Sequence, residues 1–536
     1  MWRIIRSDFQ ARLLDSGDLF EEALLSEDRP LRRVYHRGHI LIPLSVMRLN
    51  EHQDIKSAAT VPEILTALPE CSFPYTTICT VSVGLLSLSD SSEVLLLSFL
   101  PELLPWDNMN IPLLMSSTFI GELIGSVLLT PLADIYGRRP VSLFSSFTIL
   151  CAGILSSLSP NFPIFLLTRL VVGIGIGALS GPYDLLAELL PPKARGKKLL
   201  EVQYYWTLGS LLPILFLTLT KNWRVFTFLC SLPSFITFTT FLVYSCESPE
   251  WLLTQRRNEE ARTTLKWIYK WHGYKGNFED TLLKPSVSLV SHDSKSDTKC
   301  LSNVHRLFER DVLPVTVPLF MVWFCFGFGY YGLVFLTSRI FTEEGGEGGE
   351  GGNEEIFDTV SITLSALSEF LGTTVVWFTI DSLGRRKSQT FSYTFAAIGV
   401  ILMSFNIGTT FFSIIGRAAM MASTSVTWLH TPEVLQTSYR GTGHAFANGV
   451  ARVGAFLCPY VVGNFSVKGA GTFISLVTFI AVFAANKLPE SVEERGVGGE
   501  GKKGREEDEE TEMIELDHAD EEGMDMTPMA PVMIEL

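Results

Sequence analysis

The sequence lacks the side-chain patterns that point to an enzyme, a metal site or a disulfide-bonded domain. Its eight cysteines are scattered, lie mostly within apolar runs and never form a C-x-x-C pair. This spacing predicts neither a disulfide framework nor a zinc site. No nucleophile stands in a recognisable arrangement with a base either. We therefore expect a protein that is not an enzyme and that has no metal and no cofactor.

Phosphate-binding loops are also missing from the sequence. The run GIGIGA, from Gly173, has the loose spacing of a dinucleotide motif, but it lies inside an apolar segment with no strand before it. The run GVGGEGKK, from Gly496, ends in Lys503 where a phosphate loop requires Ser or Thr. We expect the first run to allow close helix packing, and neither run to bind a nucleotide.

Charge is scarce outside a few stretches. Charged residues make up 18% and hydrophobic residues 47% of the 536 residues, and the mean hydropathy is positive. The segment 490–536 alone holds 17 acidic residues against 4 basic ones, so most of the net charge of −15 belongs to this tail. An acidic tail argues against nucleic acid as a partner and leaves a cytosolic protein as its candidate partner.

Long apolar runs dominate the rest of the chain, and each is close to the roughly 20 residues that cross a bilayer as a helix. None of these runs alternates with period two, which excludes membrane β-strands. The N-terminus lacks a clean apolar core and a cleavage site, so we expect no removable signal peptide. We predict an all-α membrane protein with twelve transmembrane helices, at residues 77–104, 111–131, 141–158, 165–185, 199–219, 225–244, 313–338, 359–380, 389–406, 411–429, 444–462 and 471–485.

Lys and Arg gather in alternate loops of this arrangement. The long loop 254–311 carries eleven of them, and further clusters follow the second and fourth predicted helices. Because basic loops stay on the cytosolic side of a membrane, both termini and the long loop are predicted to be cytosolic. We expect an integral multi-pass protein, surrounded by the lipid bilayer, in the plasma membrane or an intracellular vesicle membrane.

These assignments divide the chain into five parts. We predict a cytosolic N-terminal region at residues 1–76, a six-helix half at 77–245, a cytosolic middle loop at 246–312, a second six-helix half at 313–487 and an acidic disordered tail at 488–536. The glycine and glutamate run 343–355 is also poor folding material. Asn464 begins a glycosylation sequon on the outer face, but it lies so close to the membrane that we expect it to be unused.

The two six-helix halves carry the same landmarks in the same order. The sequence LADIYGRRP, which includes Asp134, recurs as IDSLGRRKS around Asp381, 247 residues later. Arg169 and Arg417 are 248 residues apart, and ELLPPKARG matches EVLQTSYRG at an offset of 245. A nearly constant offset predicts two pseudo-symmetric halves in the same orientation. Such parallel repeats are typical of transporters whose substrate site lies between the halves.

The motifs also resemble the signature set of the major facilitator superfamily. They are LADIYGRRP, the run R-x-x-x-G-x-G-x-G from Arg169, E-x-x-P-x-x-x-R-G from Glu188, ESPEWLL and TPEVLQTSYRGTG. Within residues 81–490, the segments GLLSLSDSSEVLLLSFL, FGYYGLVFLTSRIF, LSEFLG and VARVGAFLCP are most similar to the synaptic vesicle 2-related proteins and to related organic-ion and nicotinate transporters. The resemblance implies a transporter of a small-molecule substrate.

The resemblance further implies a gating role for the repeated loop motifs. In this family the loops are latches that favour the outward-facing state, and an arginine can hold a carboxylate with two hydrogen bonds. Anchoring by positive charge alone would explain the arginines but not the repeated aspartates. The residues assigned to gating are Asp134, Gly137, Arg138, Arg139, Arg169, Glu188, Arg195, Asp381, Gly384, Arg385, Arg386, Arg417, Glu433 and Arg440.

Charges inside the predicted helices are costly unless they face protein or water, and they therefore mark candidate function. Asp90 and Glu93 are three residues apart, so they lie on one face of the first helix. Carboxylates near arginines can accept protons, and an arginine can hold an anionic substrate. The alternative is a structural ion pair between helices. The residues assigned to substrate binding or coupling are Asp90, Glu93, Glu201, Glu369, Arg452 and Tyr331.

Other helix residues belong to the same hypothesis. Asp184 is a further charge within a predicted helix, whereas Glu122 lies nearer a predicted helix start and is left out of the site. Aromatic residues can wall a site for a flat ring, although in helices they more often only pack. The candidates for such a wall are Tyr204, Trp206, Tyr330 and Tyr331.

These features indicate a secondary active transporter that moves a small organic ion by alternating access, with a proton as the candidate coupling ion. A second hypothesis is a non-transporting scaffold or receptor of vesicles that keeps the fold and binds a partner through the acidic tail. The repeated latches and the buried charges favour transport, because a scaffold needs neither.

Overall fold

The computed structural model describes residues 58–66, 75–107, 109–271, 282–284, 305–347, 357–435 and 440–490 of the 536-residue chain. All of them belong to one compact unit, residues 55–536. The predictions for the first 57 residues, for the glycine-rich run beyond residue 347 and for the acidic tail after residue 490 fall outside the described residues.

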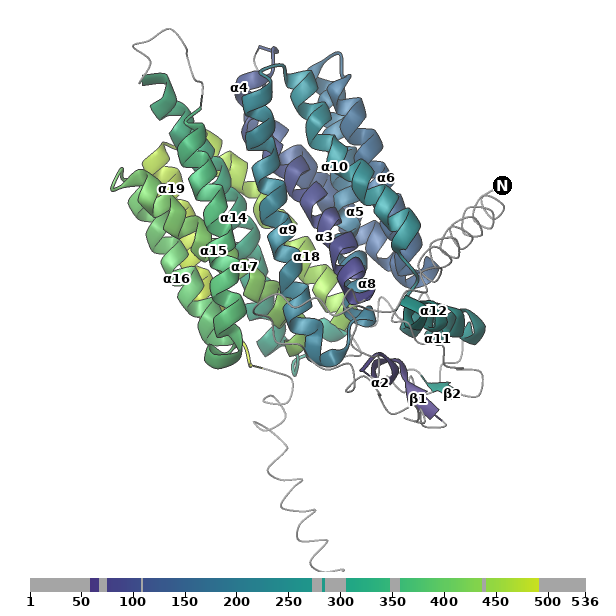
Figure 1. Cartoon of the computed structure of the whole chain (residues 1–536). Coiled ribbons are helices and arrows are strands. Elements are labelled where there is room, and N and C mark those ends of the chain that lie inside the picture. The colour runs from purple at the N-terminus through teal and green to yellow at the C-terminus, as the bar shows by residue number, and fades with distance from the viewer. Residues whose placement is uncertain are drawn as a thin grey trace, which may run out of the picture. The chain divides into compact units, whose positions relative to one another are not determined.

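Twelve long helices form an all-α bundle of two six-helix halves, which confirms the predicted fold class (Figure 1). The first half consists of α3 (Tyr75–Leu95), α5 (Ile111–Tyr136), α6 (Arg138–Ser157), the pair α7 and α8 (Phe162–Ile176 and Ser180–Leu189), α9 (Pro192–Leu219) and α10 (Trp223–Tyr244). The second half consists of α14 (Leu313–Glu347), α15 (Thr359–Leu383), α16 (Arg385–Ser404), α17 (Thr409–Val434), α18 (Arg440–Asn464) and α19 (Val467–Asn486). One apolar cluster of buried side chains runs through both halves.

Ten of the described helices are long and apolar enough to cross a membrane. The other two, α16 and α17, carry buried hydroxyl groups, and α17 also carries Arg417. Such hydroxyls bond to the helix itself, as Ser404 does by donating to the Val400 carbonyl at 2.7 Å. Because α16 packs against both α17 and α19, the two helices belong to the bundle and complete the predicted twelve.

Two of the predicted helices are interrupted in the structure. The first, expected to be continuous over 77–104, is α3 followed by a 3₁₀ turn at Leu96–Ser98 and the short helix α4 at Leu100–Leu103. The fourth changes to a 3₁₀ turn at Gly177–Leu179 between α7 and α8. An apolar run is compatible with either geometry, so composition alone does not reveal these turns.

Glycines set the start of two helices at one end of the bundle. Gly137 and Gly384 have φ values of +106° and +79°, which strain any residue with a side chain. Because α6 and α16 begin directly after them, the paired arginines lie in the first helical turn rather than in the loop that we predict. We call this end the loop-motif end and the opposite end, where Asn110 and Asp358 cap helices, the Asn110 end.

Small residues let equivalent helix pairs of the two halves approach closely. A Cβ atom on Gly173 of α7 would lie 2.0 Å from the Thr118 carbonyl oxygen of α5. One on Gly372 of α15 would lie 2.0 Å from the Ala418 carbonyl oxygen of α17. The run GIGIGA therefore packs one helix against another, as predicted, and such close backbone approach is typical of membrane helices.

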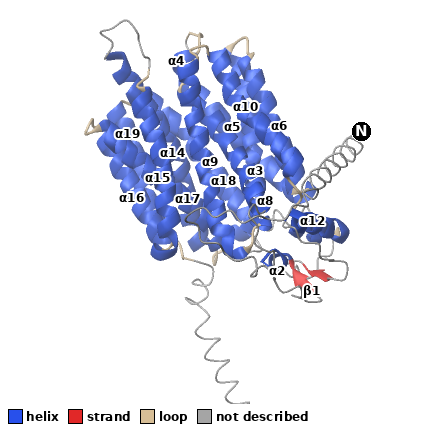
Figure 2. Cartoon of the chain, in the orientation of Figure 1, coloured by secondary structure: helices blue, strands red, loops and turns tan. Residues whose placement is uncertain are grey.

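Two segments outside the bundle pack together. Strand β1 (Ala58–Thr60) pairs in parallel with β2 (Leu282–Lys284), drawn red in Figure 2. Tyr269 of α12 (Asn258–Trp271), which follows α11 (Pro249–Thr254), donates to the Ile64 carbonyl of α2 (Val61–Thr66) at 2.7 Å. These elements are not predicted from the sequence. A pair of three-residue strands does not change the all-α class.

Candidate functional site

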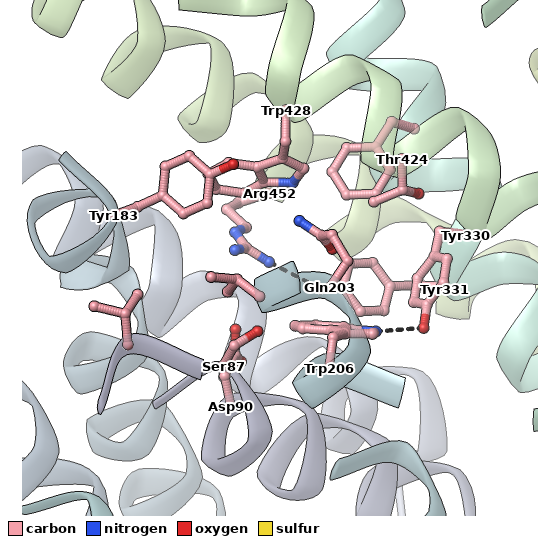
Figure 3. Close-up of a pocket in the computed structure, with 13 residues that line it drawn as sticks. Ser87, Asp90, Tyr183, Gln203, Trp206, Tyr330, Tyr331, Thr424, Trp428 and Arg452 are labelled. Carbon is pink, nitrogen blue, oxygen red and sulfur yellow. Dashed lines mark hydrogen bonds between the residues drawn. The ribbon is translucent and has the colours of Figure 1, made fainter. Parts of the chain in front are cut away.

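A cavity lies between the two halves of the bundle (Figure 3). Its volume is about 60 Å³, which is room for a few water molecules. The first half contributes side chains from α3, α8 and α9, and the second half from α14, α17 and α18. The lining residues are Val83, Ser87, Asp90, Tyr183, Val202, Gln203, Trp206, Phe326, Tyr330, Tyr331, Thr424, Trp428 and Arg452.

Asp90 is the acidic residue of the cavity wall. Its side chain is 2% exposed, and no described group forms a hydrogen bond with its Oδ1 atom. Asp90 comes from α3 and Arg452 from α18, and both point toward the cavity from opposite halves (Figure 3). The structure thus brings two predicted site residues together. A buried carboxylate without a partner is costly, which makes Asp90 a strong functional candidate.

Glu93 lies one turn further along α3 and is fully buried within the first half. Arg169 of α7 donates from Nη1 to Glu93 Oε2 at 2.7 Å. The same guanidinium donates from Nε and Nη2 to the Ser156 hydroxyl of α6 at 3.0 and 2.6 Å. Arg169, which we predict as a gating residue, is therefore the partner of a predicted coupling carboxylate.

The second half contains a comparable buried pair. Arg417 of α17 donates from Nε to Glu369 Oε1 of α15 at 2.8 Å. The Tyr330 hydroxyl donates to the same oxygen at 2.8 Å and itself accepts from Trp206 Nε1 at 2.6 Å. Because Trp206 belongs to the first half, this network joins the halves through two residues of the cavity wall.

A third buried pair connects the halves directly. Arg452 Nη1 lies 2.6 Å from Glu122 Oε2 of α5 and donates to the Tyr331 hydroxyl at 2.9 Å. The side chains of Arg452 and Glu122 are 5% and 0% exposed. Glu122 is not among the site residues that we predict from the sequence. The repeat offset of 247, which relates Glu122 to Glu369, is the signal that identifies it.

Glu201 and Tyr204 belong neither to the cavity wall nor to the buried ion pairs. Glu201 pairs with Lys198 of the same helix at 2.8 Å, and its side chain is 35% exposed. Tyr204 packs between the halves, where its hydroxyl bonds to Thr374 at 3.0 Å and its ring stacks on Phe370. The sequence shows that a charged or aromatic residue lies in a helix, but it does not show whether that face of the helix is directed toward the cavity.

Each half holds an ion pair at the loop-motif end. Arg138 donates from Nη2 to Glu188 Oε1 at 3.3 Å in the first half. Arg385 donates to the two carboxylate oxygens of Glu433 at 2.8 and 3.2 Å in the second half, and lies 3.8 Å from Asp381. Both pairs join helices of one half, so they tie helix ends together within each half.

Two other arginines of the loop motifs form hydrogen bonds with residues of their own half. Arg139 donates to the Ser245 hydroxyl at 3.1 Å, and Arg195 donates to the Leu190 carbonyl at 3.4 Å. The side chains of Asp134 and Arg440 lie outside the described residues. The latch role of these motifs stays a prediction.

Two glutamates that the sequence analysis does not assign cap helices at the loop-motif end. Glu247 Oε1 accepts from the backbone N–H of Arg138 at 3.0 Å, and Glu490 Oε2 from that of Arg385 at 2.8 Å. Each carboxylate satisfies free amides at the start of a helix. Burial raises the pKa of the Glu247 carboxyl, although the N–H groups that it accepts oppose this shift. The Glu-Ser pair that follows the last helix of each half, at 247–248 and 490–491, is the missed signal.

Side chains of the two halves meet on both sides of the cavity. Toward the loop-motif end, the ring centroids of Tyr183 and Trp428 are 5.3 Å apart. Toward the Asn110 end, the centroids of Phe119 and Tyr331 are 4.6 Å apart. The cavity is therefore narrowed by aromatic contacts in both directions.

Comparison with known proteins agrees with this architecture. The sugar (and other) transporter family matches residues 63–494. The synaptic vesicle 2-related protein of Xenopus laevis is 30% identical over 403 residues, which cover 70% of this chain and 71% of the relative. Organic cation/carnitine transporter 7 of Arabidopsis thaliana is 25% identical over 467 residues, which cover 79% and 91% of the two chains.

Solved structures show the same fold. The xylose transporter XylE from E. coli, in a partially occluded inward-open conformation, has a TM-score of 0.59 at 17% identity, covering 76% of this chain and 96% of that one. XylE bound to 6-bromo-6-deoxy-D-glucose has a TM-score of 0.58 at 19% identity, covering 78% and 98%. The chain belongs to the sugar (and other) transporter family of the major facilitator superfamily, a family of multi-pass membrane transporters.

Proposed function

We propose that this protein is a secondary active transporter of a small organic ion that works by alternating access. The observation that carries the proposal is the cavity between the two halves, with buried Asp90 and Arg452 in its wall. Charges at this depth are costly and are found where a substrate or ion passes. A scaffold that does not transport has no need for them.

The arrangement of inter-half contacts supports alternating access. Tyr183 with Trp428 narrows the cavity on one side and Phe119 with Tyr331 on the other. Rocking of one half against the other would separate one set of contacts while the other set stays closed. The ion pairs at the loop-motif end, which lie within each half, would let each half move as a rigid body.

Proton coupling is part of the proposal, with Glu93 as the proton acceptor. Its carboxylate is held by Arg169 at 2.7 Å, one helical turn from Asp90 in the cavity wall. A proton on Glu93 would neutralise the carboxylate and release Arg169. The loss of attraction between the two side chains would be large, because the Coulomb attraction between buried charges is strong. Protonation of Glu93 and binding of substrate in the neighbouring cavity would then influence each other.

We further propose that the loop-motif end faces the cytosol, because the basic loops lie there. We propose a vesicle membrane as the location of the protein, because a relative is named synaptic vesicle 2-related protein. The plasma membrane is the alternative. The acidic tail is then a cytosolic extension that can bind a partner.

Uptake by the purified protein in proteoliposomes tests the proposal. The assay uses a labelled panel of organic cations and anions, including nicotinate, with and without an inward proton gradient. We expect accumulation of at least one compound, stimulated by the gradient, and loss of that stimulation in Glu93→Gln. Glu259→Gln, a change at a carboxylate that is 91% exposed, is the matched control. Absence of uptake of every compound by folded protein would contradict the proposal.

Deletion of residues 496–536 tests whether the acidic tail takes part in transport or only binds a partner. A transporter whose tail only binds a partner keeps its uptake rate in proteoliposomes after the deletion. Loss of uptake on deletion, with the protein folded, would show that the tail is part of the transport machinery instead.

A further inference from the structure

The buried charges of the described residues do not balance. They are four acids, Asp90, Glu93, Glu122 and Glu369, and three arginines, Arg169, Arg417 and Arg452. Each arginine forms an ion pair with one of the glutamates, at distances between 2.6 and 2.8 Å. Three neutral pairs therefore account for every buried arginine. The aspartate is the acid left over.

The remaining acid, Asp90, is also the one that lines the cavity. It forms no ion pair with a described residue, and no described group bonds to its Oδ1 atom. The other three acids are absent from the cavity wall. The cavity wall thus contains one carboxylate that forms no ion pair with a described residue, and one arginine, Arg452, that is already paired with Glu122.

Aromatic rings from both halves surround the same space. Trp206 and Tyr330 pack edge to face, with centroids 5.9 Å apart, and Trp428 closes the wall beside Tyr183 (Figure 3). Ring faces attract cations through their quadrupole, and this attraction is larger where water is excluded. A carboxylate set among such rings is the usual chemistry for recognising an organic ammonium ion.

We propose that the cavity binds an organic monocation, with its positive nitrogen at Asp90 and its apolar body against the rings of Trp206, Tyr330 and Trp428. This inference rests on the proposed transport function and names the class of its substrate. One positive charge neutralises the one unbalanced carboxylate, which removes the cost of burying that charge alone. Expansion of the cavity on opening of either side supplies the room that the closed conformation lacks.

An anionic substrate fits the same wall less well. Arg452 is the one cation among the lining residues, and its Nη1 already serves Glu122 and Tyr331. An anion bound to Arg452 would lie close to two buried carboxylates, Glu122 at 2.6 Å from the same guanidinium and Asp90 in the same cavity wall. An organic cation at Asp90 breaks no ion pair, because Asp90 forms none with a described residue.

Four compounds that share one ring test the proposal. They are 1-methylnicotinamide, a pyridinium cation; nicotinamide, which is neutral; nicotinate, an anion; and 1-methylnicotinate, a zwitterion. Binding to the full-length protein in nanodiscs is measured by isothermal titration calorimetry. We expect the cation to bind at least tenfold more tightly than nicotinamide, and Asp90→Asn to reduce this preference to less than threefold.

Two further variants make the result interpretable. Asp90→Glu keeps the charge and is expected to retain the preference for the cation, which excludes loss of fold as the explanation. Glu259→Gln is the exposed control. Equal binding of cation and nicotinamide, tighter binding of nicotinate, an unchanged preference in Asp90→Asn, or no binding of any of the four compounds would overturn the inference.

The outcome is separable from that of the proposed function. Gradient-driven uptake of an anion from the wider panel, without cation binding, would leave transport standing and overturn the substrate class. Cation binding that depends on Asp90, with no uptake of any compound, would support the binding site and overturn transport.

Discussion

At the scale of single residues, buried carboxylates and arginines are arranged as one pair in each half and one pair between the halves. Glu93 with Arg169 belongs to the first half, and Glu369 with Arg417 to the second. Glu122 with Arg452 crosses between them. A pair within a half can keep its geometry while the halves move, whereas the crossing pair has to move with them.

Removing one partner of the Glu122–Arg452 pair is predicted to reduce the stability of the protein more than removing both. Arg452→Met leaves Glu122 unpaired and should destabilise the protein by roughly 3–5 kcal/mol. The double variant Glu122→Gln, Arg452→Met removes both charges of this pair and should recover most of that loss of stability. Thermal unfolding of the purified variants measures the effect. If the double variant unfolds at the temperature expected from adding the single effects, the two residues do not act as a pair.

Glu247 is predicted to make stability depend on pH. Its raised pKa means that the folded protein holds this proton more tightly than the unfolded chain does. The stabilisation is therefore complete below the ordinary glutamate pKa of about 4.3, and is lost as the pH rises through the folded-state pKa. Glu247→Gln should lose less stability than the wild type over this rise in pH. Unfolding temperatures recorded across the pH series, with Glu259→Gln as the control, test this, and parallel curves for all three proteins would contradict it.

The sequence identifies these residues better than it identifies their partners. Asp90, Glu93 and Arg452 stand out because a charge is rare in an apolar run. Their partners depend on which helix faces they share, and a one-dimensional pattern does not contain this. Glu201 is a charge in the same kind of run, yet it turns toward Lys198 and a partly exposed surface. Glu122 is overlooked although the repeat offset points to it.

At the scale of helices, the closest contacts depend on glycine. A Cβ atom at position 173 would lie 2.0 Å from a backbone oxygen of α5, which no side-chain movement relieves. Position 449 of α18 offers a contrast, because a Cβ there would meet Leu123 at an ordinary 3.7 Å. Both glycines lie in apolar helices, so only the three-dimensional packing distinguishes them.

Gly173→Ala is therefore predicted to be poorly tolerated and Gly449→Ala to be tolerated. Overpacking of this kind costs roughly 1–3 kcal/mol or more, because α5 and α7 must separate. The measurement is the yield of monodisperse protein on size-exclusion chromatography, together with the unfolding temperature. Equal behaviour of the two variants would contradict the assigned packing.

The sequence predicts that the helices exist, but it does not predict where they are interrupted or where they begin. Twelve apolar runs predict twelve helices because only a helix satisfies its backbone within one segment in lipid. The 3₁₀ turn at Gly177–Leu179 and the early starts of α6 and α16 depend on local dihedral angles at glycine. The small assembly of α2, α12 and the paired strands depends on contacts between segments about 200 residues apart.

At the scale of the whole molecule, the two halves meet at both ends and enclose a cavity between them. The repeat in the sequence predicts the halves and the place of the site, because equivalent landmarks recur at a nearly constant offset. It does not predict which side of the cavity is open. That property depends on side-chain contacts across the interface, such as those of Tyr183 and Phe119.

Cross-linking the halves at either end tests alternating access most directly. A Cβ on Gly463 would lie 2.9 Å from Pro112 at the Asn110 end, and one on Gly196 would lie 3.8 Å from Leu429 at the loop-motif end. The pairs Pro112→Cys with Gly463→Cys and Gly196→Cys with Leu429→Cys are introduced into a chain without its native cysteines. Uptake into proteoliposomes is then measured before oxidation, after it and after reduction.

We expect uptake by both reduced variants, loss of uptake when either disulfide forms, and recovery on reduction. A substrate cannot cross if one side is held closed. Uptake that continues at an unchanged rate with either disulfide fully formed would contradict alternating access between the two halves.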